Sequence, residues 1–239
     1  MIQNSPDPNP QSNDYPLVSV ILVVRNGEAY VSDAIESVLA SDYRPLEIVV
    51  VDGQSSDRTA AIVQRYPEVR YHYQNTLGIA QAYNQGIEAA NGDFVAFISH
   101  DDQWSPQKLS RQMAYLLAHA EVQFTVCKFR YFLETGCQIP PGFRAELLEQ
   151  DLVGYIMETL VARKTVFEQV GTFNIRYQLA EDVDWYARAK DLGIPSAVVP
   201  EVLLSKRVHD RNASTNAQVS TQALLQVLRQ SIQRQKHLS

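Results

Sequence analysis

Apolar runs alternate with helically spaced apolar positions through the first half of the chain. Val18–Val24 is a continuous β-branched run, which predicts a strand buried on both faces. In residues 30–39 the apolar positions recur every three or four residues, which predicts an amphipathic helix. The same patterns predict further strands at 47–51, 69–73, 93–98 and 122–131. They predict helices between these strands, at 57–66, 79–90 and 106–119. This alternation indicates an α/β fold built from parallel β-α-β units.

The second half of the chain is less regular. The segment 136–142, which contains Pro140-Pro141, is interpreted as a loop, and two short strands are expected within 198–207 around Pro200-Glu201. Helices are predicted at 163–170, 181–192 and 217–238. Residues 1–16 are rich in Asn, Pro, Ser and Asp and are expected to form a disordered leader, with order beginning at Leu17.

The predicted division of the chain follows from these patterns. We expect one domain at 17–215, with a nucleotide-binding half at about 17–120 and an acceptor half at about 121–215, followed by a C-terminal helix at 216–239. No apolar run reaches transmembrane length, and the leader lacks the apolar core of a signal peptide. A cytoplasmic setting is therefore expected, and the sequon at Asn212 carries no meaning there.

Composition and charge narrow the classes of function. The chain has 239 residues, of which 45% are hydrophobic and 20% charged, an ordinary globular balance. A net charge of -6 argues against a general nucleic-acid binder, so any phosphate handled here needs a metal or local backbone donors. The two cysteines, Cys127 and Cys137, form no Cys-x-x-Cys pair, and we interpret them as thiols rather than a disulfide.

Polar residues collect where predicted strands end, which is where parallel α/β sheets bind ligands. Asp52 closes the second strand and precedes a polar turn that ends in Asp57. A carboxylate there can accept hydrogen bonds from a base or a ribose. The alternative is that Asp52 is a turn residue, as Asp57 fits a helix N-cap.

The fourth predicted strand leads into Ser99-His100-Asp101-Asp102. Clustered carboxylates at a strand end are costly unless a cation neutralises them. Mg²⁺ or Mn²⁺ held by one or two carboxylates together with substrate phosphates is the natural cation for such a site. The alternative is a solvated acidic turn before the helix that starts near Pro106.

Two later segments have weaker signals of their own. In Glu181-Asp182-Val183-Asp184-Trp185, Glu181 and Asp184 share a helix face while Asp182 points elsewhere, and a first-turn carboxylate can act as a general base or only cap the helix. Arg207-Val208-His209 ends a strand, and a lone histidine is weak evidence for a ligand.

Taken in order, these motifs resemble glycosyltransferase family 2 from about residue 18 to residue 215. The similar segments are Val18–Ile21 with Asn26-Gly27-Glu28, then 47–59, 78–92, 97–108, Val170-Gly171-Thr172-Phe173, Glu181-Asp182 and Arg207-Val208-His209. The resemblance implies the GT-A fold, in which a Rossmann-like, mostly parallel central sheet is flanked by helices, with a smaller acceptor-side subregion. An ordered set of motifs is more specific than any one of them.

The resemblance also implies residue roles. Asp52 would contact the donor base, Asp101 would bind a divalent cation bridging the diphosphate, His209 would be a further metal or diphosphate contact, and Asp182 would be the general base. Other positions of the same motifs are expected on the donor side: Val23, Arg25, Asn26, Glu28, Gly53, Gly78, Tyr83, Asn84, Ser99 and His100. Candidates on the acceptor side are Asp102, Trp104, Glu181 and Trp185.

The chain departs from the family pattern at several of these positions. Ser99 stands where the family often has Asp, so the Asp-x-Asp motif is incomplete and metal affinity is expected to fall. Arg25, Gly53 and Tyr83 also replace more usual residues. Arg25 has a guanidinium plane that can stack on a base. Tyr83 replaces an Arg and so removes a donor contact.

The implied reaction is inverting sugar transfer from a nucleoside-diphosphate sugar, by default a UDP-sugar, to the hydroxyl of a glycan, lipid-linked or other acceptor. Acceptor choice is expected to lie in residues 136–159. Two alternatives stay open: a degenerate module that binds a nucleotide sugar without turnover, and a nucleotidyltransferase. The C-terminal helix is expected to pack on the domain, to form a homodimer or to lie on the inner face of a membrane through Arg229, Arg234 and Lys236.

Overall fold

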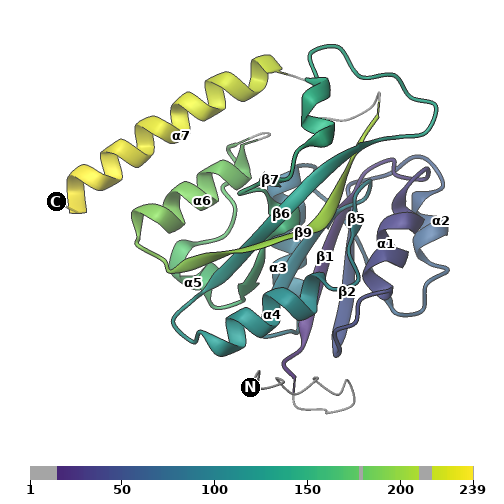
Figure 1. The fold of residues 1–239 in the computed structure, drawn as a ribbon, viewed down its shortest axis with the longest axis horizontal. Helices are drawn as coiled ribbons and strands as arrows, with labels where there is room; N and C mark the ends of the chain where they lie inside the picture. The colour runs from purple at the N-terminus through teal and green to yellow at the C-terminus, as the bar shows by residue number, and fades with distance from the viewer. Residues whose placement is uncertain (1–14, 178–179, 210–216, 239) are drawn as a thin grey trace, which may run out of the picture.

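A computed structural model describes residues 15–177, 180–209 and 217–238 (Figure 1). One mixed sheet runs through the molecule in the order β3-β2-β1-β4-β8-β6-β9-β5, with β7 paired to β6. Its strands are β1 (Val18–Val24), β2 (Leu46–Asp52), β3 (Val69–Tyr73), β4 (Phe94–Ser99), β5 (Gln103–Trp104), β6 (Phe124–Leu133), β7 (Leu152–Val153), β8 (Val161–Arg163) and β9 (Ser196–Val208). The pairs β1–β2, β1–β4, β2–β3 and β6–β9 are parallel, which confirms the predicted mostly parallel sheet.

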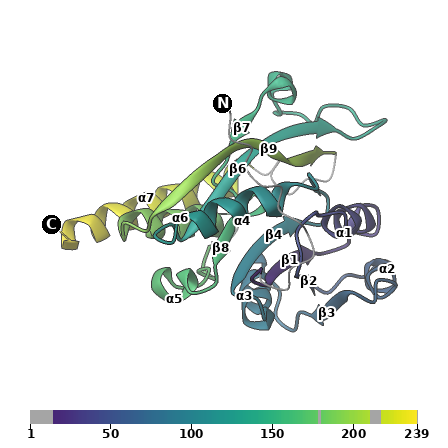
Figure 2. The ribbon, with the colours of Figure 1, turned by 60° about the horizontal axis from the view of Figure 1, so that its bottom comes forward.

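Helices cover both faces of this sheet (Figure 2). They are α1 (Val31–Leu39), α2 (Thr59–Val63), α3 (Ile79–Ala89), α4 (Lys108–Ala118), α5 (Val166–Val170), α6 (Glu181–Asp191) and α7 (Ala217–Leu238), with short 3₁₀ turns η1 (Ala145–Glu149) and η2 (Met157–Thr159). Because side chains alternate along β1, Val20 and Leu22 pack with α1 and α4, whereas Ile21 and Val23 pack with α3, α5 and α6. The double burial explains the unbroken apolar runs.

The short strands are the main elements that the sequence pattern did not predict. β5 and β8 contain two and three residues and pair antiparallel with β9 and β4, respectively. Val161–Arg163 therefore belongs to the sheet, and the helix predicted at 163–170 begins only at Val166. Such short runs have too few residues to show a period.

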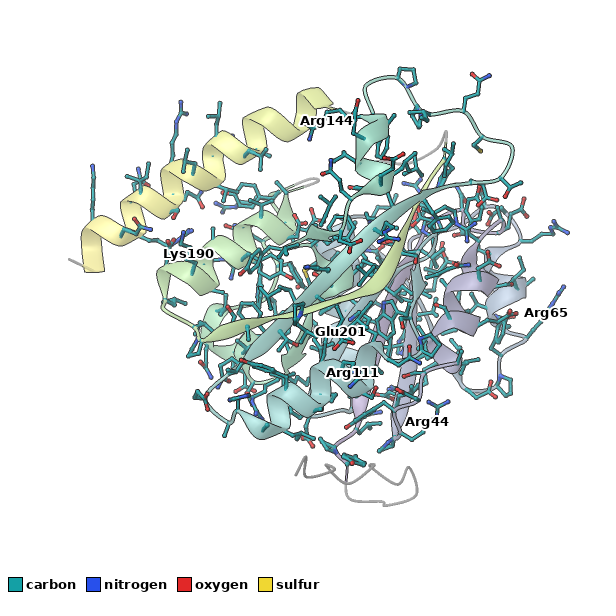
Figure 3. The ribbon with its side chains drawn as sticks, in the orientation of Figure 1. Arg44, Arg65, Arg111, Arg144, Lys190 and Glu201 are labelled. Carbon is teal, nitrogen blue, oxygen red and sulfur yellow. The ribbon has the colours of Figure 1, made fainter. Side chains whose placement is uncertain are left out.

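The prediction of two short strands around Pro200-Glu201 is wrong, because β9 is one strand of 13 residues. Cys127 pairs with Val199 and Lys128 with Val202, so Pro200 and Glu201 have no opposite residue on β6. Proline has no amide hydrogen for the ladder, and a bulge accommodates it without ending the strand. Glu201 also forms an ion pair with Arg111 of α4, with Nε and Oε2 3.4 Å apart; both residues are labelled in Figure 3.

The ends of the predicted domain are only partly described. Residues 1–14 and 210–216 lie outside the described residues, so the leader and the sequon stay predictions. The leader boundary is two residues too long, because Tyr15 stacks on Tyr43 and the hydroxyl of Tyr43 donates to the carbonyl of Pro16. Both cysteines are free thiols, and within the described helices none is long and apolar enough to cross a membrane.

Candidate active site

The turns that follow β1 and β2 hold each other through short neutral hydrogen bonds. The amide of Asn26 donates to Ser55 Oγ and the amide of Ser56 donates to Asn26 Oδ1, each at 2.8 Å. The amide of Gly27 donates to Thr59 Oγ1, also at 2.8 Å. Asn26 has a φ of 53°, which an asparagine tolerates better than most residues. Asn26 thus holds the turn, while the neighbouring Arg25 is exposed.

Glu28 belongs to the same pair of turns. Its carboxylate accepts from the backbone amide and from Nε of Arg58, and its amide donates to Asp57 Oδ2. Asp57 also accepts from the amide of Thr59, which starts α2. Asp57 is the expected N-cap, but α2 begins at Thr59 with Arg58 as its N-cap, so Asp57 instead stabilises the turn one residue earlier. The carboxylate of Glu28 is thus bound within the protein by Arg58, and its contact with the sugar donor stays a prediction.

Asp52 is only 1% exposed, and both of its oxygens are engaged. Oδ1 accepts from the amide of Ser55 at 2.8 Å, and Oδ2 accepts from the hydroxyl of Tyr71 at 2.8 Å. Next to it, the amide of Gly53 donates to the carbonyl of Val24. A base can reach this carboxylate only if the turn moves, so the structure gives Asp52 first the role of holding that turn.

Four of the predicted contact residues have side chains buried in the core, so a direct side-chain contact with a ligand stays a prediction for each of them. Tyr83 is 3% exposed and packs its ring edge against Phe97, and Val23 is 7% exposed on β1. Trp104 is 5% exposed beneath the ammonium of Lys108, and Trp185 is fully buried with its indole N–H on the carbonyl of Gly171. Large apolar side chains after a strand or in an amphipathic helix find more stabilisation in the core than in a cleft.

Asn84 and Gly78 have structural partners as well. The amide nitrogen of Asn84 donates to the carbonyl of Phe173, and its oxygen accepts from the amide of Phe173. Asn84 therefore fixes the 171–173 loop onto α3. Gly78 precedes α3 with a φ of 145°, a conformation that side chains rarely adopt. Asn84 also lines a pocket of about 340 Å³ with Gln74 and Gln81.

Charged side chains gather where β4 ends and β9 passes beside it. His209 Nε2 and Asp101 Oδ2 are 3.1 Å apart, which brings together two residues that are 108 positions apart in the chain. The ring of Tyr30 stacks on His209 at a centroid distance of 4.9 Å. Burial by itself raises the pKa of Asp101, but His100, Lys206 and His209 outweigh it and lower that pKa. The predicted pair of metal-site residues is therefore assembled, with an ionised carboxylate.

Arg207 fixes the backbone around this pair. Its guanidinium forms ion pairs with Asp33 of α1, at 2.8 Å, and with Glu134, which follows β6. Its Nε also donates to the carbonyl of Asp101 at 2.9 Å. Arg207 is 6% exposed, so its role is to hold β9, α1 and the 99–102 turn together.

The sequence did not predict that Glu158 and Lys206 belong to the same cluster. Lys206 Nζ donates to Asp102 Oδ2 at 2.9 Å and to Glu158 Oε1 at 3.1 Å, and Ser99 Oγ donates to Glu158 Oε1 at 2.6 Å. Asp102 also accepts from the amide of Arg207 and is 1% exposed. It is therefore tied into the protein, which corrects its predicted acceptor-side role. Glu158 belongs to no recognised motif. It lies in the three-residue 3₁₀ turn η2, which is too short to show a sequence pattern.

Asp182 lies at the first turn of α6, within electrostatic reach of this cluster. Burial raises its pKa to about 6, Glu158 adds to that shift and Lys206 opposes it. Neighbouring Glu181 is 5% exposed, its Oε2 is a buried atom without a hydrogen-bond partner among the described residues, and its pKa is raised to about 7, chiefly by burial. Asp182 is the more accessible of the two carboxylates, which suits a group that must meet a substrate.

The cluster has an excess of negative charge. The carboxyl groups of Asp101, Asp102, Glu158, Glu181 and Asp182 lie within electrostatic reach of one another, with the ammonium of Lys206 among them. Burial raises the pKa of both Asp102 and Glu181 to about 7, so these two carry only part of their negative charge at neutral pH. A divalent cation would relieve this imbalance. In the described part of the chain no group of three or more His, Cys, Asp or Glu side chains is arranged as a metal site. Asp101 and His209 therefore fit a cation only if phosphate or water supplies the remaining ligands, as Mg²⁺ commonly requires.

Comparison with known proteins decides the family. Residues 19–181 match the sequence profile described as "Glycosyl transferase family 2". The chain belongs to this family of glycosyltransferases. It is 30% identical over 227 residues to an uncharacterised glycosyltransferase of Rickettsia typhi, covering 87% of this chain and 69% of that protein. It is 27% identical to the putative teichuronic acid biosynthesis glycosyltransferase TuaG of Bacillus subtilis, covering 86% and 84%.

Solved structures confirm the GT-A fold of this glycosyltransferase. S. aureus TarS 1-349 in complex with UDP-GlcNAc superposes with a TM-score of 0.74 at 22% identity, covering 91% of this chain and 66% of that one. The mannosyltransferase PcManGT from Pyrobaculum calidifontis, in complex with GDP-Man and Mn²⁺, gives 0.72 at 21% identity, covering 95% and 66%. The chain thus spans about two thirds of the length of these solved chains.

Proposed function

We propose that this glycosyltransferase transfers a sugar from a nucleoside-diphosphate sugar to an acceptor hydroxyl with inversion at the anomeric carbon. The observation that carries the proposal is the convergence of the Asp101–His209 pair and Asp182 on one charged cluster. Solved relatives of the same fold bind UDP-GlcNAc or GDP-Man, so UDP and GDP sugars are the first donors to test.

Each half of the reaction needs a different part of the cluster. The acceptor oxygen attacks the anomeric carbon, the bond from that carbon to the diphosphate breaks, and the acceptor proton passes to a carboxylate oxygen of Asp182. A pKa near 6 leaves Asp182 ionised at neutral pH yet more basic than an ordinary aspartate, as a general base requires.

The leaving nucleoside diphosphate gains negative charge, and Asp101 and His209 would hold a divalent cation beside it. Bound Mn²⁺ or Mg²⁺ would supply Lewis-acid stabilisation of that charge. The ring position of His209 is set by Tyr30, and the backbone of Asp101 is set by Arg207. The side chains of Asp101 and His209 are thus already ordered before a cation binds, so less conformational entropy is lost on binding.

We place the acceptor on the side formed by residues 136–159. Tyr155 is 50% exposed there, and its ring meets Tyr186 of α6 edge to face at 5.3 Å. An exposed aromatic ring packed on the helix that contains the proposed base offers an apolar face to a sugar or a lipid-linked acceptor. The segment also contains Glu158, which links it to the charged cluster.

A thermal-shift panel of nucleotides and nucleotide sugars tests the donor proposal. A nucleoside-diphosphate sugar should raise the midpoint of thermal unfolding more with Mn²⁺ than with EDTA, because a ligand of the folded state stabilises it by mass action. Release of nucleoside diphosphate from the same sugar separates an enzyme from a module that only binds. A panel in which no nucleotide sugar shifts the midpoint or is turned over contradicts the proposal.

We also propose that α7 places the enzyme on an anionic membrane surface. One side of α7 packs on α6 through Val227, which is 3% exposed, and through Ser231 and Arg234, which hydrogen-bond Asp191. On the other side Leu225, Leu228 and Ile232 are 46–57% exposed. The helix contains basic residues and no acidic residue, although the chain is acidic overall. Such a face suits anionic lipids better than a second copy of itself.

Vesicle co-sedimentation tests this surface. The protein should bind phosphatidylglycerol vesicles and not phosphatidylcholine vesicles, and binding should vanish when Leu225, Leu228 and Ile232 are all changed to Gln. A control variant changes Gln226, Gln230 and Gln233 to Ser on the same helix. Absence of binding to either vesicle, or a dimer that depends on the three apolar residues, contradicts the proposal.

A further inference from the structure

Lys206 is held in the charged cluster by two acceptors only. Its Nζ donates to Asp102 Oδ2 at 2.9 Å and to Glu158 Oε1 at 3.1 Å, and its side chain is 22% exposed. An ammonium has three hydrogens to donate. Among the described residues no third acceptor contacts Nζ, so one N–H of the ammonium is left for a ligand.

The ammonium is kept charged by its surroundings. Burial by itself would lower the pKa of Lys206, but Asp102, Glu158 and Asp101 outweigh it and hold that pKa well above its usual value. Lys206 in turn lowers the pKa of Asp101 and opposes the rise in the pKa of Asp182. It therefore lies within electrostatic reach of both the proposed cation ligand and the proposed base.

Ser99 makes this arrangement possible. Its hydroxyl donates to Glu158 Oε1 at 2.6 Å, the same oxygen that accepts from Lys206. Asp at position 99 would place a second carboxylate against that oxygen, and like charges at hydrogen-bond distance repel. The hydrogen bond from Ser99 instead helps Glu158 stay ionised, and the ionised Glu158 holds the ammonium of Lys206. The change from Asp to Ser at position 99 is therefore accompanied by a lysine cation in the site.

We propose that the third N–H of Lys206 binds the diphosphate of the donor and stabilises its charge as the sugar leaves. The inference rests on the proposed function and adds to it a protein cation that works beside the divalent ion. An ammonium contacts a phosphate as a point charge without needing a planar partner. A preformed donor aimed at developing charge is among the strongest devices for transition-state stabilisation.

Binding of UDP, GDP and the matching nucleosides in EDTA tests this contact without any metal or turnover. The wild-type protein should bind the nucleoside diphosphate more tightly than its nucleoside. Lys206→Met should weaken diphosphate binding by roughly 10- to 100-fold, the range expected for one charged hydrogen bond, and leave nucleoside binding unchanged. Lys206→Arg should keep part of the preference because it keeps the charge.

Lys190→Met is the matched control. Lys190 lies at the far end of α6, is exposed and is labelled in Figure 3. Its loss removes the same formal charge from the chain and should leave both affinities unchanged. If Lys190→Met weakens diphosphate binding as much as Lys206→Met, the effect is one of net charge and the inference is overturned.

Lys206→Met leaves Asp102 and Glu158 without their counter-ion, which can prevent folding. The pair of variants Glu158→Gln and Glu158→Gln/Lys206→Met reduces this problem, because the double variant removes one charge of each sign and leaves only Asp102, whose pKa burial raises to about 7, without Lys206. The diphosphate preference should be present in the first and lost in the second. Equal preference in both, or equal loss for diphosphate and nucleoside, overturns the inference.

The same binding measurements distinguish failure of the proposed function from failure of the role given to Lys206. If the wild-type protein binds no nucleoside diphosphate even with Mn²⁺, the donor proposal fails and the role of Lys206 fails with it. If the wild type binds and Lys206→Met binds equally well, only the role of Lys206 fails.

Discussion

Two regions of the sheet edge differ in how they hold their polar groups. The turns after β1 and β2 are joined by hydrogen bonds between residues about 30 positions apart, such as Asn26 and Ser56, and by the exposed ion pair of Glu28 and Arg58. The cluster around Asp101 draws on β4, η2, α6 and β9, and its members carry charge. The first region is satisfied without a ligand, whereas the second has more negative charge than its one lysine can balance.

The difference suggests separate roles for the two regions. The turns after β1 and β2 support a bound nucleotide, and the charged cluster around Asp101 takes part in the proposed reaction. Hydrogen bonds within the turns fix backbone that a nucleotide can lie against, and the carboxylates of Glu28, Asp52 and Asp57 each accept from donors of the same turns. Burial, with a smaller contribution from neighbouring carboxylates, raises the pKa of Asp182 and Glu181, and a bound cation would favour their charged forms. Strongly perturbed groups of this kind cluster at functional sites. We therefore expect changes in the charged cluster to affect catalysis and changes in the turns to affect binding.

The largest effect is expected from Asp182→Asn. Loss of the general base should lower donor turnover by roughly 10²- to 10⁴-fold and change the donor dissociation constant little. Product release measured with Mn²⁺ and calorimetry of donor binding check the two parts. Glu68→Gln, at an exposed carboxylate before β3 and outside the proposed donor and acceptor regions, is the control for losing a carboxylate. Near-normal turnover in Asp182→Asn would remove this residue from the mechanism.

Asp101→Asn and Asp52→Asn test the comparison directly. Asp101→Asn should weaken Mn²⁺-dependent nucleotide binding by at least about 10- to 100-fold, because loss of even an outer-sphere partner has that effect on metal affinity. Asp52→Asn should weaken nucleotide binding to the same extent with Mn²⁺ and with EDTA, because it loosens the turn held by Ser55 and Tyr71. Metal dependence that survives Asp101→Asn contradicts the assignment of the cation site.

The pH dependence of turnover should report Asp182. Burial raises its pKa from 3.8 to about 6, so the base is protonated and inactive below that value. Turnover should be level above pH 6 and fall about tenfold per unit below it. Turnover measured as a function of pH, at saturating donor and Mn²⁺, shows this acidic fall. A limb centred near an ordinary aspartate pKa would mean that the buried cluster does not tune the base.

The smallest effect is expected from Glu181→Gln, and it concerns stability. Burial raises the folded pKa of Glu181 from an ordinary value of 4.5 to about 7, so its charged form destabilises the fold progressively as pH rises between these values. Replacing it should raise the free energy of unfolding by about 1–3 kcal/mol above pH 7 and change it little below pH 4.5. Urea unfolding at both pH values checks this, with exposed Glu146→Gln as control. A gain that does not depend on pH would contradict the electrostatic cause.

The regular half of the fold could be predicted because its strands are buried on both faces. The apolar runs of β1, β2 and β4, and the periodicity of α1, α3 and α4, match the structure to within a few residues. β5 and β8 are too short to show a pattern, and the bulge at Pro200 looked like a strand break. The C-terminal half therefore depended on pairing that only the assembled sheet supplies.

The sequence by itself determined the family and the α/β class, and it singled out Asp101, Asp182 and His209 as candidate site residues, because strand ends and ordered motifs are local features. The tertiary structure decided which polar residues are free to act. It placed Tyr83, Trp104 and Trp185 in the core, tied Asp102 to Lys206, and brought Glu158 to Ser99 across 59 positions. Electrostatic partners are set by distance in space, and no sequence period encodes that distance.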